Sequence, residues 1–283
     1  MSRLAAFCLV AVALGAAAAP AAAQDWRTVG NRRQLAGEER VRVAVEYGVG
    51  ELSIEPAEPG TLYRSSIRYD ARTFRPVHEY SPGELRLGVA GIRDGIKTDL
   101  EGSRLDLALG PDVPLDLALK FGAVEAALEL GGLRLSRVDI STGASATRLR
   151  FSKPNPIRME QLAIEAGAAE FRAEGLANAN VEALSVEGGV GDLTLDFSGA
   201  WRGDVRAHIE LGLGSLTLRI PRGVGVMVTK ETFLMGFDSQ GLVKRGDAYY
   251  STDWSTTEHR LTLDISGAFG SIDVRWVDPN DAL

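Results

Sequence analysis

Acidic side chains recur at two fixed positions around a repeated glycine, and they are the residues of this sequence best suited to chemistry. Glu46, Glu165, Glu187 and Glu210 stand two residues before the glycine, and Glu51, Glu125, Glu170 and Asp192 stand three residues after it. If equivalent positions stack in register, each set forms a row of carboxylates that repel by about 1 kcal/mol per pair in water at a spacing near 4 Å. Oxygen-rich rows of this kind favour calcium as a counterion.

The same rows have a plainer interpretation as a solvated face. Ala146, Ser215 and Ser271 interrupt the second row, and most runs of surface charge are hydrated rather than bound to an ion. We favour this interpretation and keep calcium as the one cofactor to consider. The candidate metal ligands are Glu165, Glu170, Glu187, Asp192 and Glu210.

Recognisable catalytic motifs are missing from the sequence. His78, His208 and His259 are far apart, with no second histidine at the spacing of a metal ligand. There is no Gly-x-Ser-x-Gly, no His-Glu-x-x-His, and no glycine loop that leads into a helix to bind phosphate. The sequence therefore predicts no catalytic residues, no cofactor-binding residues and no enzyme.

The acidic positions belong to a cassette in which a glycine turn is followed by an alternating apolar segment. It reads Glu-Gly-Gly-Val-Gly-Asp-Leu-Thr-Leu from Glu187 and Glu-Leu-Gly-Leu-Gly-Ser-Leu-Thr-Leu from Glu210. The cassette glycines, which we expect to form structural turns with positive φ, are Gly48, Gly122, Gly143, Gly167, Gly189 and Gly212. From Gly122 onward their intervals are 21, 24, 22 and 23 residues, a period that is typical of stacked repeats.

Apolar residues alternate on both sides of each cassette glycine, which predicts two strands per repeat. The residues four and six positions after the glycine include Leu193 with Leu195 and Leu216 with Leu218. Positions five and three before it carry the same pattern, as in Leu184 with Val186. A two-stranded unit cannot bury these residues alone, so the repeats should stack into columns of aliphatic side chains.

The fold class is therefore all-β. A twisted antiparallel sandwich of hairpins would show the same alternation. We favour a repetitive parallel β-solenoid, a β-helix-like rack of two-stranded units with a period of about 22 residues, because that period is long for hairpins and short for a βαβ unit.

The chain divides into segments of different character. Residues 1–23 have a basic start, an apolar run and small residues at the end, which predicts a cleaved signal peptide, and Cys8 lies inside that run. Residues 24–110 largely lack the cassette and should form an irregular N-terminal β subdomain or cap. Residues 111–283 should form the solenoid, with a capping insertion at 222–258.

The predicted export and the net charge of the chain restrict which classes of partner it can bind. Removal of the signal peptide takes away Arg3 alone among the charged residues, so the net charge of −7 becomes −8, which disfavours nucleic acid. No second apolar run is long enough for a transmembrane anchor. We expect an exported protein, periplasmic or at the cell surface.

A family resemblance is carried by three segments: Val113-Pro114-Leu115-Asp116-Leu117, Asp139-Ile140-Ser141-Thr142-Gly143 and the run Gly188 to Gly199. With them, the chain resembles the toast-rack family of exported bacterial β-repeat proteins. It is similar, more distantly, to the C-terminal domain of cell-wall-active antibiotic response proteins and to proteins classed as adhesins. The resemblance implies an all-β rack in the cell envelope and supplies no catalytic residues.

These observations predict a non-catalytic envelope protein whose repetitive surface binds or adheres to a glycan or protein partner. One alternative is a polysaccharide-active β-helix enzyme, which needs a cleft where acidic residues meet arginines and aromatic rings. Arg148, Arg150, Arg158 and Arg172 are available for such a cleft. A second alternative is an envelope-stress sensor or regulator, which the distant family resemblance implies.

Overall fold

The protein is a single β-sheet that folds over itself along one edge. The computed structural model describes residues 25–92 and 102–278, and in these ranges it contains fifteen strands and no helix. The predicted signal peptide, with Cys8, lies outside the described residues. Within the described residues, no helix has the length and apolar character that crossing a bilayer requires.

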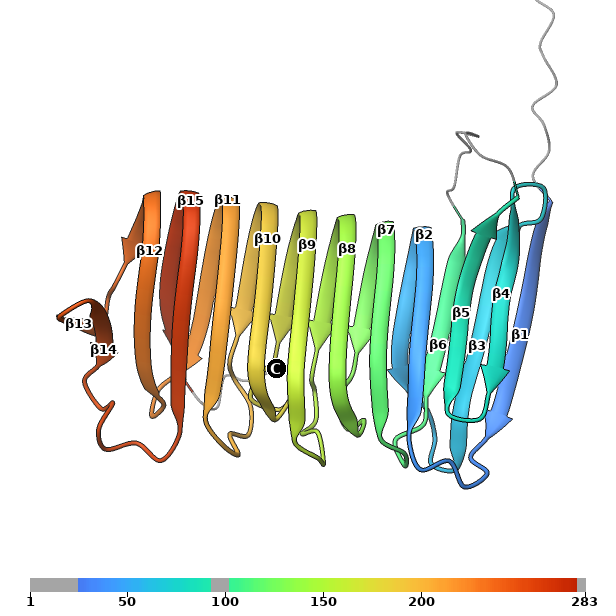
Figure 1. The fold of residues 1–283 in the computed structure, drawn as a ribbon, viewed down its shortest axis with the longest axis horizontal. Helices are drawn as coiled ribbons and strands as arrows, with labels where there is room; N and C mark the ends of the chain where they lie inside the picture. The colour runs from blue at the N-terminus through green and yellow to red at the C-terminus, as the bar shows by residue number, and fades with distance from the viewer. Residues whose placement is uncertain (1–24, 93–101, 279–283) are drawn as a thin grey trace, which may run out of the picture.

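Seven long strands stand side by side as parallel neighbours and form the regular part of the rack (Figure 1). In spatial order they are β2 (Val41–Pro56), β7 (Leu115–Glu129), β8 (Leu135–Arg150), β9 (Met159–Glu174), β10 (Val181–Asp196), β11 (Val205–Pro221) and β15 (Arg260–Val277). The parallel pairing confirms the solenoid prediction over the hairpin sandwich.

Each long strand rises on one side of the rack, bends at its cassette and descends on the other side (Figure 1). We call the part before the cassette glycine the first arm and the part after it the second arm. The two strands predicted per repeat are thus two arms of one strand. The pairing of β10 with β11 runs from Ala183 opposite Arg206 to Asp196 opposite Arg219 and passes through the bend.

The core lies between the two arms, and it consists of the predicted columns. Every column residue is buried, and Phe171, Leu193, Leu216 and Ile272 are successive neighbours in one of them. Burying a large aliphatic side chain stabilises a fold by roughly 1.5 to 3 kcal/mol. Each strand buries its column residues against those of its two neighbours, so this stabilisation depends on the stacking of the strands.

Buried asparagines join the loops at the open end of the arms, a feature that the apolar pattern does not predict. Asn155 is fully buried, and its Nδ2 donates to the carbonyl oxygens of Leu135 at 2.8 Å and Ala179 at 3.2 Å. Asn178 donates likewise to the Phe151 carbonyl at 2.8 Å. These amides satisfy loop carbonyls that would otherwise be buried without partners.

The cassette glycines are needed for a different reason from the one expected. None of the cassette glycines has positive φ, neither Gly189 nor Gly48, Gly122, Gly143, Gly167 and Gly212. That conformation occurs two residues after three of them, at Gly50 with φ 115°, Gly191 with φ 141° and Gly214 with φ 140°. At Gly189 the requirement is space, because a Cβ there would lie 2.5 Å from the carbonyl oxygen of Gly167 on the neighbouring strand. The expectation of positive φ at the cassette glycines is therefore wrong, and close packing between strands explains the need for glycine at Gly189.

At the N-terminal end the sheet divides in two. β5 (Glu84–Gly91) pairs with the first arm of β2, and β6 (Arg104–Leu109) pairs with its second arm. β4 (Phe74–Ser81) continues from β5, while β3 (Thr61–Asp70) and β1 (Trp26–Gln34) continue from β6, all antiparallel. The sheet is continuous across residue 110, because β2 pairs with β7.

At the C-terminal end the chain order and the spatial order differ. β15 lies between β11 and β12 (Gly225–Asp238), so the chain passes over one position and later returns to fill it (Figure 1). The short strands β13 (Leu242–Arg245) and β14 (Ala248–Ser251) follow beyond β12. The segment 222–258 thus lies at this end of the sheet.

Candidate binding surface

The bend carries a groove that crosses seven strands. It has a volume of about 990 Å³ and is lined by the cassette glycines, the residues directly before them, and the row that contains Glu165, Glu187 and Glu210. The lining extends from Glu46 on β2 to Gly267 on β15. At about 4.8 Å per strand, six steps give a length of roughly 29 Å.

Much of the floor of the groove is bare because the strands pack too closely for side chains at Gly122, Gly167, Gly189 and Gly212. At Gly48 and Gly143 there is room for a Cβ. A Cβ on Gly212 would lie 2.5 Å from the carbonyl oxygen of Gly189, just as one on Gly189 would meet Gly167. The repeated glycine therefore creates a continuous channel across the sheet.

An exposed apolar row, which we call the crest, directly follows the groove. It consists of the residue after the cassette position in each long strand, together with two residues of β12: Val49, Ala123, Ala144, Ala168, Val190, Leu213, Phe269, Phe233 and Leu234. From Ala168 onward the side chains become larger along the row, through Val190 and Leu213 to Phe269. The Phe233 and Phe269 rings meet edge to face with their centroids 6.0 Å apart, which joins β12 to the row.

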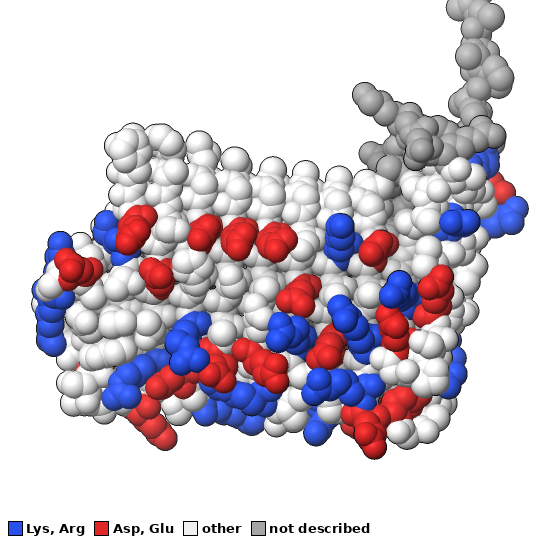
Figure 2. Space-filling view, viewed as in Figure 1, with Lys and Arg blue, Asp and Glu red and all other residues white. Residues whose placement is uncertain are grey.

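On the first arm, the acidic row is continuous over three neighbouring strands. Glu165 is paired in register with Glu187, and Glu187 with Glu210. Figure 2 shows adjacent acidic side chains below an upper edge that is free of charge. The Ser141 hydroxyl donates to Glu165 at 3.0 Å. Within residues 25–92 and 102–278, no lysine or arginine forms an ion pair with any of the three glutamates.

His208 lies beside the end of this row. Its Nε2 is 2.9 Å from Glu210 Oε1, and its Nδ1 is 3.4 Å from Asp264 Oδ2. The hydrogen bond to Glu210 and the charge of Asp264 raise the pKa of His208. Of the other histidines, His78 hydrogen-bonds to Tyr63 and His259 stacks on Trp201, so the three do not form a site.

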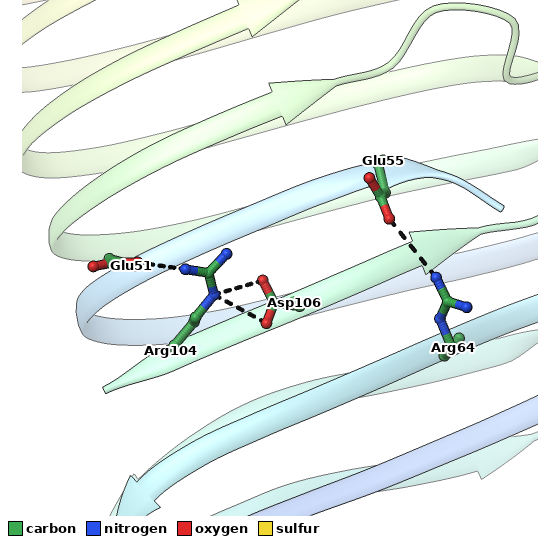
Figure 3. A network of polar contacts seen from close by, with 5 residues as sticks. All are labelled: Glu51, Glu55, Arg64, Arg104 and Asp106. Atoms are coloured by element: carbon green, nitrogen blue, oxygen red, sulfur yellow. Dashed lines mark hydrogen bonds and ion pairs between the residues drawn. The ribbon is translucent and has the colours of Figure 1, made fainter. Parts of the chain in front are cut away.

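The acidic row on the second arm is neutralised at its N-terminal end. Arg104 Nη1 donates to Glu51 at 2.8 Å and its Nε donates to Asp106 at 2.8 Å, while Arg64 lies 3.8 Å from Glu55 (Figure 3). Glu170 and Asp192 are neighbours farther along the row.

The structure does not assemble the candidate metal ligands. Glu165, Glu187 and Glu210 lie before the bend, and Glu170 and Asp192 lie after it. In the part of the chain that the structure describes, no group of three or more His, Cys, Asp or Glu is arranged to hold a metal ion.

The arginines that an enzyme would require lie elsewhere. A hollow of about 510 Å³ on the second arm gathers Glu125, Glu170, Arg148 and Arg172, and no aromatic residue lines it. Arg148 and Arg172 both lie within 4 Å of Glu174. Arg150 lies 3.9 Å from Glu129, and Arg158 donates to the Asp204 carbonyl.

Comparison with protein-family models shows which family the chain belongs to. A family model described as the N-terminal domain of toast_rack, DUF2154, matches the chain at residues 22–172 and again at 155–219. The chain belongs to the toast-rack family. The two matches together cover residues 22–219 of this toast-rack chain and end within β11, so they include most of the groove. No curated protein matches the chain.

Several solved structures align with nearly the whole toast-rack chain, at low identity and with TM-scores below 0.5. A "putative cell adhesion protein" from Clostridium sporogenes is 18% identical, with a TM-score of 0.47, over 89% of this chain and 100% of that one. A "putative adhesin" from Bacteroides fragilis is 10% identical, with a TM-score of 0.38, over 88% and 97%. A "putative lipid binding protein" from Parabacteroides distasonis is 10% identical, with a TM-score of 0.38, over 89% and 97%.

Sequence reasoning located the glycines and acidic rows of the toast-rack surface but missed the crest. A signal was present, because an apolar residue directly follows every cassette glycine from Val49 to Leu213. Strict alternation would place that residue opposite the glycine, on the inner side. Instead the bend turns both residues outward, and Val190 and Leu213 are half exposed.

Proposed function

We propose that the protein is a non-catalytic component of the cell envelope that binds an elongated partner, a glycan or another protein, along the groove and crest. The observation that carries this proposal is the crest. Of the seven large apolar side chains that are strongly exposed in residues 25–92 and 102–278, five lie on it: Val190, Leu213, Phe233, Leu234 and Phe269. Exposed apolar side chains gathered in one patch mark interaction sites more often than isolated ones do.

The repeat explains why such a surface suits binding. Stacked repeats produce an extended face on which equivalent side chains recur at a fixed spacing, so a long partner meets similar chemistry on each strand. The predicted signal peptide supports export to the periplasm or the cell surface. The family and the described residues offer no acid, base and nucleophile set from which a reaction could be derived.

The test compares binding by the mature protein and two variants on a glycan array and on immobilised envelope proteins, with and without calcium. We expect saturable binding that Leu213→Asp weakens by about tenfold, because the new charge would be desolvated at the contact. Val243→Asp is the matched control, since Val243 is 47% exposed but lies on β13, away from the groove. An equal loss of binding affinity in Leu213→Asp and Val243→Asp would contradict the proposal. Breakdown of a bound polysaccharide would also contradict it.

A further inference from the structure

The crest and its surroundings narrow the chemistry of the partner, given the proposed function. Its strongly exposed aliphatic members are Val190, Leu213 and Leu234, 53%, 50% and 61% exposed, and its aromatic members are Phe233 and Phe269, 77% and 45% exposed. These side chains supply no hydrogen-bonding groups. A partner that covers them must therefore bring an apolar face of its own.

The acidic residues beside the crest specify the charge of that partner. Before the bend, Glu165, Glu187 and Glu210 stand on adjacent strands at a spacing of about 4.8 Å. After the bend, Glu170 and Asp192 are neighbours on two of the same strands. Carboxylates therefore flank the crest on both sides over β9 and β10. After the bend, Arg148 and Arg172 line the same hollow as Glu170, whereas no lysine or arginine of the described residues pairs with the three glutamates before the bend. Positive charges of a partner that lie against the row before the bend relieve its repulsion.

Other occupants of the crest fit these charges less well. A second copy of the chain, packed crest against crest, would bring acidic rows together, and like charges in an interface oppose association. An anionic membrane surface would be repelled for the same reason. A neutral glycan needs hydrogen-bonding groups that the apolar crest does not offer.

We infer that the groove and crest bind a cationic amphipathic polypeptide segment, whose apolar face covers Val190 and Leu213 and whose lysines or arginines lie against Glu165, Glu187 and Glu210. The length of the groove, roughly 29 Å, accommodates about 20 residues of α-helix at 1.5 Å per residue. Recognition of an amphipathic helix in a groove is a familiar mode, in which apolar residues anchor the helix and charges set its specificity.

The test uses two synthetic peptides of about 20 residues, the length of the groove in helical form. One peptide has leucine and lysine at helical spacing, and the other has glutamate in place of every lysine. Binding to the full mature protein is measured by fluorescence anisotropy at low and high salt. We expect the lysine peptide to bind at least about tenfold more tightly than the glutamate peptide, with a preference that declines as salt is added.

Two pairs of variants separate local from general effects. Glu187→Lys should weaken binding of the lysine peptide by about fivefold or more, whereas Glu182→Lys should change it less than about twofold. Both residues lie on β10 and both substitutions change the net charge equally, but Glu182 is outside the groove and pairs with Arg206. Leu213→Ser should weaken binding by about fivefold, and Val243→Ser should leave it unchanged.

Each contrary result has a distinct meaning. Equal binding of both peptides, or equal effects of Glu187→Lys and Glu182→Lys, would overturn the charge assignment. Failure of the lysine peptide to bind, while a glycan or an envelope protein binds in a manner that Leu213→Ser weakens, would overturn the inference and leave the proposed function standing. Binding of phosphatidylcholine vesicles alone would overturn both. Failure of the peptides, glycans, envelope proteins and vesicles alike would overturn both.

Discussion

Replacement of Leu216 by Asp is expected to destabilise the protein by about 4 kcal/mol or more and to abolish cooperative folding at moderate temperature. Leu216 is fully buried in the second arm of β11, between Leu193 and Ile272 in its column. An aspartate there would have no counterion and would leave a cavity beside both neighbours. Thermal denaturation followed by circular dichroism measures the effect.

Val190→Asp is the control for this substitution. It also places a charge where an aliphatic residue stood, but Val190 lies on the crest and is 53% exposed. We expect its melting temperature to stay within a few degrees of the parent, because surface substitutions change stability by about 0.5 kcal/mol. Similar melting curves for Leu216→Asp and Val190→Asp would show that the columns are assigned wrongly.

Gly212→Ala is the second substitution with a large expected effect, and it should lower stability by about 2 to 4 kcal/mol. The added Cβ would lie 2.5 Å from the Gly189 carbonyl oxygen. Rigid backbone surrounds this contact, so the two strands must separate at the bend. The midpoint of urea denaturation at equilibrium measures the loss.

Gly48→Ala tests whether close packing is the cause. Gly48 occupies the same cassette position on β2, but a Cβ there would meet nothing within 4 Å. We expect this variant to be neutral or stabilised by up to about 1 kcal/mol, because alanine restricts the unfolded chain. If Gly48→Ala and Gly212→Ala destabilise equally, backbone conformation rather than strand spacing must explain the glycine.

The sequence predicts the core of this fold because the core depends on a short-range pattern. Residues such as Leu184 and Leu195 alternate with polar ones around each cassette glycine, and both are buried as that pattern requires. The ends of the sheet are less predictable. β15 lies between β11 and β12, out of chain order, and no local pattern in the sequence encodes that placement.

The binding surface is predictable only in part, also for a physical reason. The acidic rows follow from counting residues from the cassette glycine, so Glu187 and Glu210 were expected to be neighbours, and they are. The exposure of Leu213 depends on the geometry of the bend, where two consecutive residues face outward. Alternation alone cannot reveal such a break in the strand pattern.

Site-specific photo-crosslinking in the cell of origin tests whether the groove and crest form the contact surface. A photoreactive phenylalanine analogue is placed at Leu213 and, as a control, at Arg206, which is exposed on the same strand β11 but lies outside the groove. We expect a discrete adduct from position 213 and little adduct from position 206. The segment crosslinked at position 213 should be polypeptide, rich in lysine or arginine, and apolar on one face. Equal adducts from both positions, or an adduct only from position 206, would contradict this assignment of the contact surface.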